Sequence, residues 1–402
     1  MISKEIMHYS LRNLWHNKGR SSLTILSIFI GIVTIFIFVS FGWGLYDYIE
    51  EVTASGTADK IIIQQKGIAT PGLDDSFYFT ESDLRSVEKT TGIYEVSGVG
   101  FKPAKITQGK EIKYVFLIAY NPKEPLIMDI FGVNIDRGRN LRPGDGRKVV
   151  LGSNYLLEDK IFSRNYELND EIKIQENKLK VIGFFETIGN PQDDSNIYVT
   201  LDYKKEIYNE DEITYDWIIA SVDTSNIENI ISNVEDSVRN SRDLKEGEED
   251  FFVQSYQEMI DTYSNILDII IGFVILIALI SVLVSAINTA NTMITSVLER
   301  IQEIGIIKSI GARNSEIFKL FLFESSVLGF IAGFLGIVFG FILTFIGGKI
   351  LQNFGWSFLQ PHYSIYLFIG CILFAIITGA ISGVVPAVNA SKTNPVEALR
   401  YE

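Results

Sequence analysis

Four long stretches without a charged residue constrain this chain more than any other feature of its sequence. They cover residues 21–46, 269–298, 325–348 and 365–388, and the shortest holds 24 residues. About 20 helical residues cross the hydrocarbon core of a bilayer, so each stretch is long enough to span a membrane. We therefore predict transmembrane helices over residues 21–46, 263–296, 317–349 and 362–388.

A secretory signal is the alternative for the first stretch, because Lys4, Arg12, Lys18 and Arg20 precede it. Signal cores usually hold about 7 to 15 apolar residues. The uncharged run of 26 residues is longer than that, which favours a helix that stays in the membrane.

The positive charges of the short connecting segments are distributed unevenly. Lys and Arg number four in residues 1–22, four in 291–319 and two in 389–402, against Lys349 alone in 347–364. Short segments rich in these residues stay in the cytoplasm. We therefore predict a multi-pass protein of the cell membrane with both termini cytoplasmic. The loop 297–316 and the tail 389–402 are then cytoplasmic, and residues 47–262 lie outside.

The predicted external region is large enough to bury an apolar core of its own. Between residues 46 and 265 the chain has 41 Asp or Glu against 24 Lys or Arg. A negatively charged surface disfavours nucleic acid as a partner. The simplest explanation of the negative charge is solubility outside the cell.

The composition of this region excludes several classes of catalytic site. The histidines and the single cysteine of the chain all lie elsewhere, at His8, His16, His362 and Cys371. A Ser/His/Asp hydrolase, a Cys/His protease, a disulfide and a zinc site made from His or Cys therefore cannot form there. Adjacent carboxylates such as Asp193 and Asp194 lack the spacing of a calcium-binding loop, so we interpret them as solvated turn residues.

Short β-branched or alternating segments bounded by turn residues predict strands in the external region. They cover residues 60–65, 114–119, 148–151, 171–175, 178–184 and 217–222. Thr80 followed by Asp83 predicts a capped helix over 80–90, and Ser225 followed by Glu228 predicts one over 225–237. The region is therefore expected to be an α+β domain.

The fold class predicted is an α-helical membrane protein with four transmembrane helices and a large extracytoplasmic α+β domain between the first and second. Within residues 47–262 we predict two subdomains. Residues 47–130 and 213–262 form a mixed α/β subdomain, and 131–212, richest in short strands and turns, form an inserted β-rich subdomain. Residues 251–268 are predicted to extend the second transmembrane helix as a helical stalk.

The charged segment 298–313 joins the second and third predicted spans. Apolar residues recur there at three- and four-residue spacing, which predicts an amphipathic helix with an apolar face that can pack against another surface. They are Val297, Ile301, Ile304, Ile307 and Ile310. Gly305 and Gly311 each cost roughly 1 kcal/mol of helix propensity, so we expect another backbone to approach closely at these positions.

The transmembrane stretches carry no charge at their centres, which disfavours an ion-driven carrier. Asp268 and Glu324 lie only at the edges, and we interpret Glu324 as an interfacial carboxylate that reaches the lipid headgroups. Glycines at GxxxG spacing predict close helix packing instead. They are Gly329, Gly333, Gly336, Gly340, Gly379 and Gly383.

No energy source is encoded in the sequence. The nucleotide-binding pattern G-x-x-x-x-G-K-[ST] is absent, so we expect no enzyme activity, cofactor or metal in this chain, and any ATP hydrolysis must come from a partner. Residues 1–20 interleave apolar and basic side chains, which predicts an interfacial helix on the inner leaflet.

Five segments together resemble the MacB-type ABC transporter permeases. They are residues 10–32, the external GRNL and VVLG at 138–141 and 149–152, the loop ERIQEIGIIKSIGAR from residue 299, and PAVNASKTNPVEALRYE at 386–402. The resemblance covers nearly the whole chain, and its most specific parts are EIGIIKSIGA and NPVEALR. It implies a homodimer that binds two copies of a separate ATPase subunit, with ATP and Mg held by that subunit.

By this resemblance the loop 298–313 is the helix that seats in the ATPase. We take as candidate coupling residues Glu299, Arg300, Glu303, Ile304, Gly305, Lys308, Gly311 and Arg313. Glu303, Gly305, Lys308 and Gly311 fall on the family's motif.

The resemblance implies a permease that couples ATP hydrolysis to movement of its external domain, for export or extrusion of a substrate. The alternative is an FtsX-like transmitter that regulates an external enzyme or sensor without moving cargo. Membrane lipids and an extracytoplasmic partner or substrate are expected as further contacts, and nucleic acid is not.

Overall fold

The computed structural model describes residues 18–53, 58–67, 71–74 and 76–400, and these residues divide into two compact units. The helical unit comprises residues up to 45, 266–350 and 360 onward, and the α+β unit comprises 46–265 with 351–359. The interfacial helix predicted over 1–20 lies outside the described residues except at its last three positions, which belong to the next helix.

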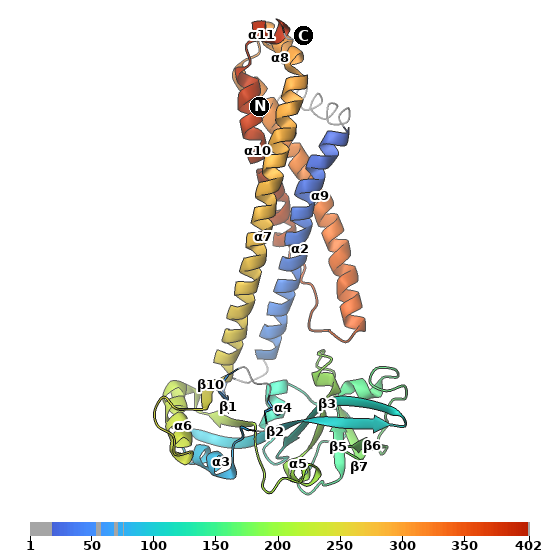
Figure 1. Ribbon diagram of the computed structural model, residues 1–402, viewed down its shortest axis with the longest axis vertical. Helices are drawn as coiled ribbons and strands as arrows, with labels where there is room; N and C mark the ends of the chain where they lie inside the picture. Colours follow the sequence, from blue (N-terminus) through green and yellow to red (C-terminus); the bar gives the residue numbers. More distant parts are fainter. Residues whose placement is uncertain (1–17, 54–57, 68–70, 75, 401–402) are drawn as a thin grey trace. The chain divides into compact units, whose positions relative to one another are not determined.

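Four helices in the described part of the chain are long and apolar enough to cross a membrane (Figure 1). They are α2 (Lys18–Thr53), α7 (Tyr256–Glu299), α9 (Asn314–Asn353) and α10 (Ile365–Lys392). Two shorter helices, α8 (Ile301–Ser309) and α11 (Pro395–Arg400), complete the described helical unit. The long helices run past most of the predicted span ends, because polar residues at the ends of a span do not stop a helix.

Small residues bring the helices of the helical unit together. Gly329 on α9 and Gly379 on α10 face each other, and a Cβ atom on Gly379 would lie 3.0 Å from the Cα of Gly329. The other four glycines of the GxxxG pairs also meet neighbouring helices. Gly333 faces Ala375, Gly336 faces Ile32, Gly340 faces Phe36, and Gly383 faces Ser325. Backbones approach closely where no side chain separates them.

A ten-stranded sheet forms the centre of the described α+β unit, in the order β10-β1-β9-β2-β3-β8-β5-β7-β4, with β6 beside β2 and β7. Most neighbours are antiparallel, and β3–β8 and β5–β7 are parallel. The strands are β1 Lys60–Gln65, β2 Ile93–Gln108, β3 Glu111–Tyr120, β4 Ile135–Gly138, β5 Lys148–Leu151, β6 Glu171–Ile174, β7 Asn177–Phe185, β8 Ile197–Thr200, β9 Trp217–Val222 and β10 Phe251–Ser255. Strands from residues 131–212 join the same sheet as the others, so the division into two subdomains stays a prediction.

Both faces of this sheet are covered. Ile61 and Ile63 of β1 belong to one buried apolar cluster and Ile62 belongs to the other, because successive side chains of a strand point to opposite faces. Helices α3 (Glu81–Glu88), α5 (Leu201–Tyr208) and α6 (Ile227–Ser241) contribute to the first cluster, and α4 (Leu126–Phe131) contributes to the second. A strand buried on both sides explains the unbroken run of isoleucines.

Local sequence signals are confirmed at some element ends and are wrong at others. Thr80 caps α3 and forms a capping box with Asp83, as predicted. Asn226, not Ser225, precedes α6, because Asp223 instead organises a short turn by accepting from the Ser225 N–H. The predicted stalk is also wrong at its start, since residues 251–255 form the edge strand β10 and the helix begins only at Tyr256.

The loop between β4 and β5 is fixed by one buried carboxylate. Asp145 accepts hydrogen bonds from Arg139 at 2.6 and 3.1 Å, from Lys148 Nζ at 2.6 Å and from the Arg142 N–H at 2.9 Å. The Arg139 guanidinium holds the pKa of Asp145 well below its usual range. The GRNL motif of the sequence thus supplies an arginine that orders this loop.

This carboxylate gives a pH-dependent prediction. Since its pKa in the folded state is depressed, its stabilising effect is present above the unfolded pKa of about 3.9 and is lost as the pH falls toward the folded value. We expect Asp145→Asn to lower the free energy of unfolding at pH 7 by about 2 kcal/mol. Urea unfolding at pH 7 and pH 3.5 measures this, and the gap between wild type and variant should narrow at the lower pH. A gap that stays constant would contradict the assignment.

Candidate functional site

The segment between α7 and α9 contains a shorter helix than predicted. Helix α7 ends at Glu299, Arg300 interrupts it with φ −104° and ψ 15°, and α8 ends at Ser309. Gly311 then takes a φ of +107°, which suits glycine because it has no Cβ atom. The continuous helix predicted over 298–313 is therefore wrong, and Gly311 ends the turn. Among the described residues, no atom lies within 4 Å of the place that a Cβ atom on Gly311 would take, so the close approach predicted there is not found.

A buried ion pair fixes the break between α7 and α8. Arg300 is 7% exposed, and its Nη1 donates to Oε2 of Glu324 on α9, which is 3% exposed, at 3.3 Å. The same guanidinium donates to Glu303 at 3.1 Å and lies 5.5 Å from the centre of the Phe321 ring. The interpretation of Glu324 as a carboxylate reaching lipid headgroups is wrong. Instead, Glu324 anchors the start of α8 to α9.

One face of α8 is covered by the C-terminal part of the chain. Gly305 is buried, and a Cβ atom there would lie 2.8 Å from the Cβ of Ala398 on α11. Lys308 Nζ donates to the carbonyl oxygens of Ser391 and Thr393 at 3.0 and 2.6 Å. A lysine at this place satisfies carbonyl groups that a helix end leaves without partners. The close backbone approach predicted at Gly305 is thus found, and its partner is α11 (Figure 1).

The opposite face of α8 is exposed and mixes polar with apolar side chains. It presents Gln302, Glu303, Ile306, Ser309 and the following Ile310. Ile306 is 53% exposed and Ile310 is 81% exposed. The predicted apolar stripe is split, because Val297 and Ile304 are buried in a cluster with residues of α9 and α10 while Ile310 points away from it. We call the residues listed in the second sentence the exposed α8 face.

The eight candidate coupling residues therefore fall into two groups. Arg300, Ile304, Gly305 and Lys308 hold α8 against α9, α10 and α11. The exposed residues are Glu299, Glu303, Gly311 and Arg313. Ile306 and Ile310, which are large apolar side chains exposed in this segment, were not among the candidates.

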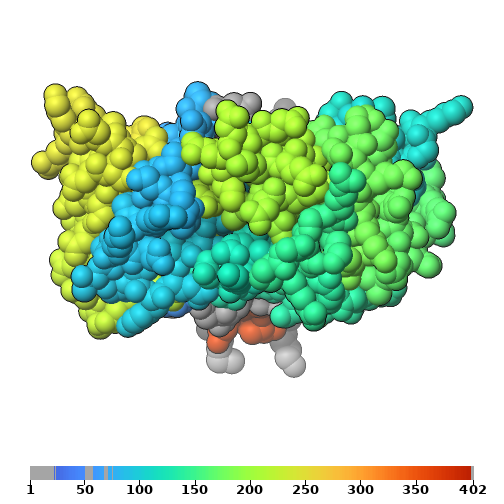
Figure 2. Space-filling model, turned by 90° about the horizontal axis from the view of Figure 1, so that it is seen from below, coloured from blue at the N-terminus to red at the C-terminus, as the bar shows by residue number. Residues whose placement is uncertain are grey.

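The α+β unit has a cleft of about 540 Å³ on one side of its sheet (Figure 2). Segments from α3, β2, the β3–α4 connection and the start of α5 line it. Its charged side chains are five carboxylates and one cation: Glu81, Glu88, Glu95, Glu124, Asp202 and Lys123.

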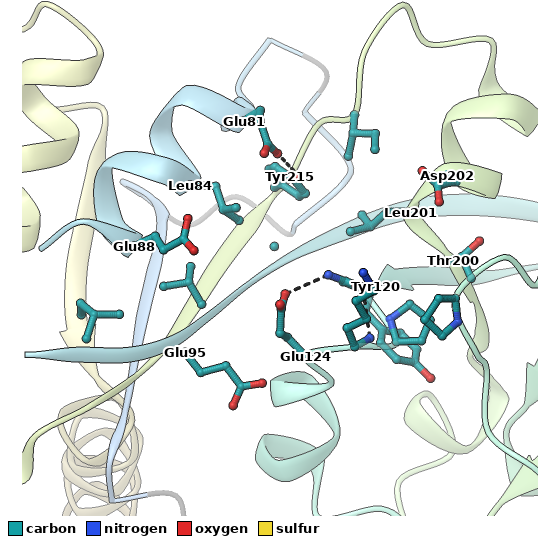
Figure 3. Close-up of a pocket in the computed structure, with 18 of the residues that line it drawn as sticks. Glu81, Leu84, Glu88, Glu95, Tyr120, Glu124, Thr200, Leu201, Asp202 and Tyr215 are labelled. Carbon is teal, nitrogen blue, oxygen red and sulfur yellow. Dashed lines mark hydrogen bonds between the residues drawn. The ribbon is translucent and has the colours of Figure 1, made fainter.

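Two tyrosines form part of the wall of this cleft (Figure 3). The buried Tyr215 donates its hydroxyl to Glu81 at 2.7 Å, and burial raises its pKa above the usual value. Tyr120 is turned toward Asn140, to which it donates at 2.6 Å. Sequence reasoning did not identify this cleft, because its lining comes from segments more than 100 residues apart.

The carboxylates Asp193 and Asp194 are not solvated as predicted. Asp194 is buried and accepts from the N–H groups of Ile188 and Gly189 at 2.7 and 3.0 Å. Burial raises the pKa of both carboxyl groups. The pair organises the turn before β8, and its oxygens are occupied by neighbouring donors from the same loop.

Both parts of the chain match known protein families. Residues 21–237 match the family model of the MacB-like periplasmic core domain, and residues 265–395 match that of the FtsX-like permease C-terminal region. An ABC transporter permease of Methanocaldococcus jannaschii is 31% identical over 401 residues, covering 99% of this chain and 98% of the relative. The ABC transporter permease YknZ of Bacillus subtilis is 27% identical, with 99% of each covered.

Two further proteins are similar, but in each case the match leaves out a large part of one of the two chains. The macrolide export ATP-binding/permease protein MacB of Bdellovibrio bacteriovorus is 26% identical over 99% of this chain, which spans 62% of that protein. Among solved structures, the periplasmic region of MacB from Actinobacillus actinomycetemcomitans is 16% identical with a TM-score of 0.39, covering 54% of this chain and 98% of that one.

The four apolar helices and the matched periplasmic core define a membrane permease with a large extracellular α+β domain. This chain belongs to the MacB/FtsX-like family of ABC transporter permeases. A permease of this class implies an ATPase partner.

Proposed function

We propose that this chain is the permease subunit of a MacB-type ABC transporter and that a separate ATPase subunit docks on the exposed α8 face. The chain pairs with a second copy, and two ATPase subunits bind ATP and Mg. Both termini and α8 lie in the cytoplasm of a cell-membrane protein, as the positive charges at residues 291–319 favour.

The observation that carries this proposal is the combination of exposure and rigidity at α8. Ile306 and Ile310 offer apolar surface, and exposed apolar clusters of this kind mark interaction sites. Arg300, Gly305 and Lys308 tie the other side of α8 to three further helices. A force applied to α8 is therefore passed to the helices and not absorbed by a mobile loop.

Helix α7 supplies the path from α8 to the extracellular domain. It is continuous from Tyr256 to Glu299, and it follows the last residue of strand β10 directly. β10 pairs with β1 over five residues at the edge of the sheet. Movement of α7 along its axis would therefore act on the sheet itself.

The output we propose is extrusion of a substrate that is handled outside the membrane, in line with the macrolide export in the name of the MacB relative. A second candidate is an FtsX-like transmitter that regulates an external enzyme. The uncharged membrane stretches favour this second output as much as the first, because neither needs a polar path through the bilayer.

Docking on α8 is tested by Ile306→Asp. We expect a charge at this exposed apolar position to weaken binding of the copurifying ABC ATPase subunit at least tenfold and to abolish permease-dependent ATP hydrolysis. Binding is measured by titrating the purified ATPase onto the chain in nanodiscs. Tyr94→Asp is the matched control, because Tyr94 is an exposed residue of the extracellular domain. Equal binding by wild type and Ile306→Asp would refute the docking site.

A further inference from the structure

A groove of about 410 Å³ lies in the α+β unit, between the edge of the sheet and the first turns of α7. Three neighbouring strands contribute to its wall. Gln64 of β1 is paired with Trp217 of β9 on one side and with Phe252 of β10 on the other. Paired residues of antiparallel strands point to the same face of a sheet, so these three side chains form one row. Gln254 of β10 follows two residues later on the same face.

The first turns of α7 form another wall of the groove. Met259, Thr262 and Tyr263 line it, and their spacing of three and four residues places them on one face of the helix. Tyr263 is 56% exposed, whereas Trp217 and Met259 are half-buried against the apolar cluster beneath them. The name α7–β10 groove is used below for seven of the lining residues: Gln64, Trp217, Phe252, Gln254, Met259, Thr262 and Tyr263.

The free polar groups of this groove are neutral amides. Gln64 and Gln254 are half-buried, and neither side chain has a hydrogen-bond partner among the described residues. Each amide offers donors on its nitrogen and an acceptor oxygen. Asp216 is the only carboxylate or cation among the described lining residues, and its two oxygens accept from the N–H groups of Gly72 and Phe101 at 3.1 and 2.7 Å. An ionic ligand would therefore lose its hydration without finding a free opposite charge.

We infer that the α7–β10 groove binds a neutral oligosaccharide. The groove has the size of a small-ligand site, since such sites occupy about 300 to 1,000 Å³. A sugar ring presents apolar C–H groups on its faces, and these groups pack against aromatic side chains such as Trp217, Phe252 and Tyr263. The hydroxyl groups of the sugar donate to, and accept from, the free amides of Gln64 and Gln254.

A lipid chain fits this groove less well than a sugar does. It would cover the aromatic side chains but leave both amides without a partner, and an unpaired buried amide costs free energy. The inference does not depend on docking at α8, because all seven residues of the groove belong to the α+β unit. Since Thr262 and Tyr263 belong to α7, a bound sugar would contact the helix that we propose moves the sheet.

Binding of two neutral trisaccharides to the full chain in nanodiscs tests the inference. Chitotriose carries N-acetyl groups and maltotriose carries only hydroxyl groups, so the comparison identifies the kind of sugar that the amides select. We expect saturable binding of at least one of them in saturation-transfer NMR. Trigalacturonate, whose sugar rings carry carboxylates, should bind at least about tenfold more weakly, because the described lining residues include no cation. The inference is wrong if neither neutral sugar binds or if trigalacturonate binds equally well.

Substitutions test whether the sugar occupies the α7–β10 groove. Gln64→Leu combined with Gln254→Leu removes both amides at nearly constant size, and Tyr263→Ala removes an exposed ring whose loss should not unfold the domain. Each change should weaken binding of the neutral trisaccharide at least about tenfold. Gln192→Leu is the matched control, because it removes an exposed amide outside the groove and should bind like the wild type. Unchanged binding by both groove variants would place the sugar elsewhere and overturn the inference.

Discussion

Replacing Arg300 with alanine is expected to lower the free energy of unfolding of the helical unit by about 3–5 kcal/mol, because it leaves the Glu324 carboxylate buried without its guanidinium partner. The penalty comes mainly from the charge left behind. The lost attraction contributes less, since taking both groups out of water already offsets much of it. Glu324→Ala should have a similar effect by leaving the arginine buried.

A double variant separates these two contributions. Arg300→Met with Glu324→Leu removes both charges and keeps apolar volume at the site, so it should recover most of the stability that either single variant loses. Arg313→Ala is the control, since Arg313 is exposed on the same loop and its removal should change the free energy by less than about 0.5 kcal/mol. Unfolding of the full chain by SDS in mixed micelles measures all four variants. Single variants as stable as wild type would show that the pair is not needed.

The ion pair also bears on the coupling to an ATPase that we propose for α8. Arg300 stands at the break between α7 and α8, and Glu324 belongs to the buried face of α9. The double variant should therefore fold and still couple ATP hydrolysis poorly, because the polar contact that fixes the angle of the break is gone. Stability and coupling are thus expected to separate in this variant.

The membrane helices and the buried strands were predictable because their signals are local. Strands β1, β5 and β9 have the predicted bounds, since each is a short β-branched run that is buried in the sheet. The 16-residue strand β2 was missed because Gly98, Gly100 and Pro103 interrupt its pattern. Gly98 is needed there because the ring of Tyr215 lies where its side chain would be.

The candidate site was predictable only in part, because its contacts join residues that are far apart in the sequence. The helix-propensity cost of Gly305 indicated a close approach, but its partner Ala398 lies 93 residues further along the chain, and no local rule identifies it. The pairing of Arg300 with Glu324 depends on how α7 and α9 pack against each other. The sequence of either helix alone does not determine that packing. Tertiary contacts of this kind decide which face of α8 is exposed.

The contact between α9 and α10 gives the second large prediction. A Cβ atom on Gly379 would lie 2.5 Å from the carbonyl oxygen of Ser325 and 3.0 Å from the Cα of Gly329. These are backbone atoms, so they cannot rotate away as a side chain would. Gly379→Leu must push the two helices apart, and we expect a loss of about 3 kcal/mol in the free energy of unfolding.

Gly370 offers a matched control nine residues earlier on the same helix. It is exposed, and no atom of the described residues lies within 4 Å of the place a Cβ would take. Leucine favours a helix over glycine by up to about 1 kcal/mol. Gly370→Leu should therefore be neutral or slightly stabilising in the same SDS titration that destabilises Gly379→Leu. Close packing at Gly379 is contradicted if the two leucine variants unfold alike. If only the Gly379 variant unfolds early, the glycine is required by the approach of α9 to α10, since helix propensity alone would favour both substitutions equally.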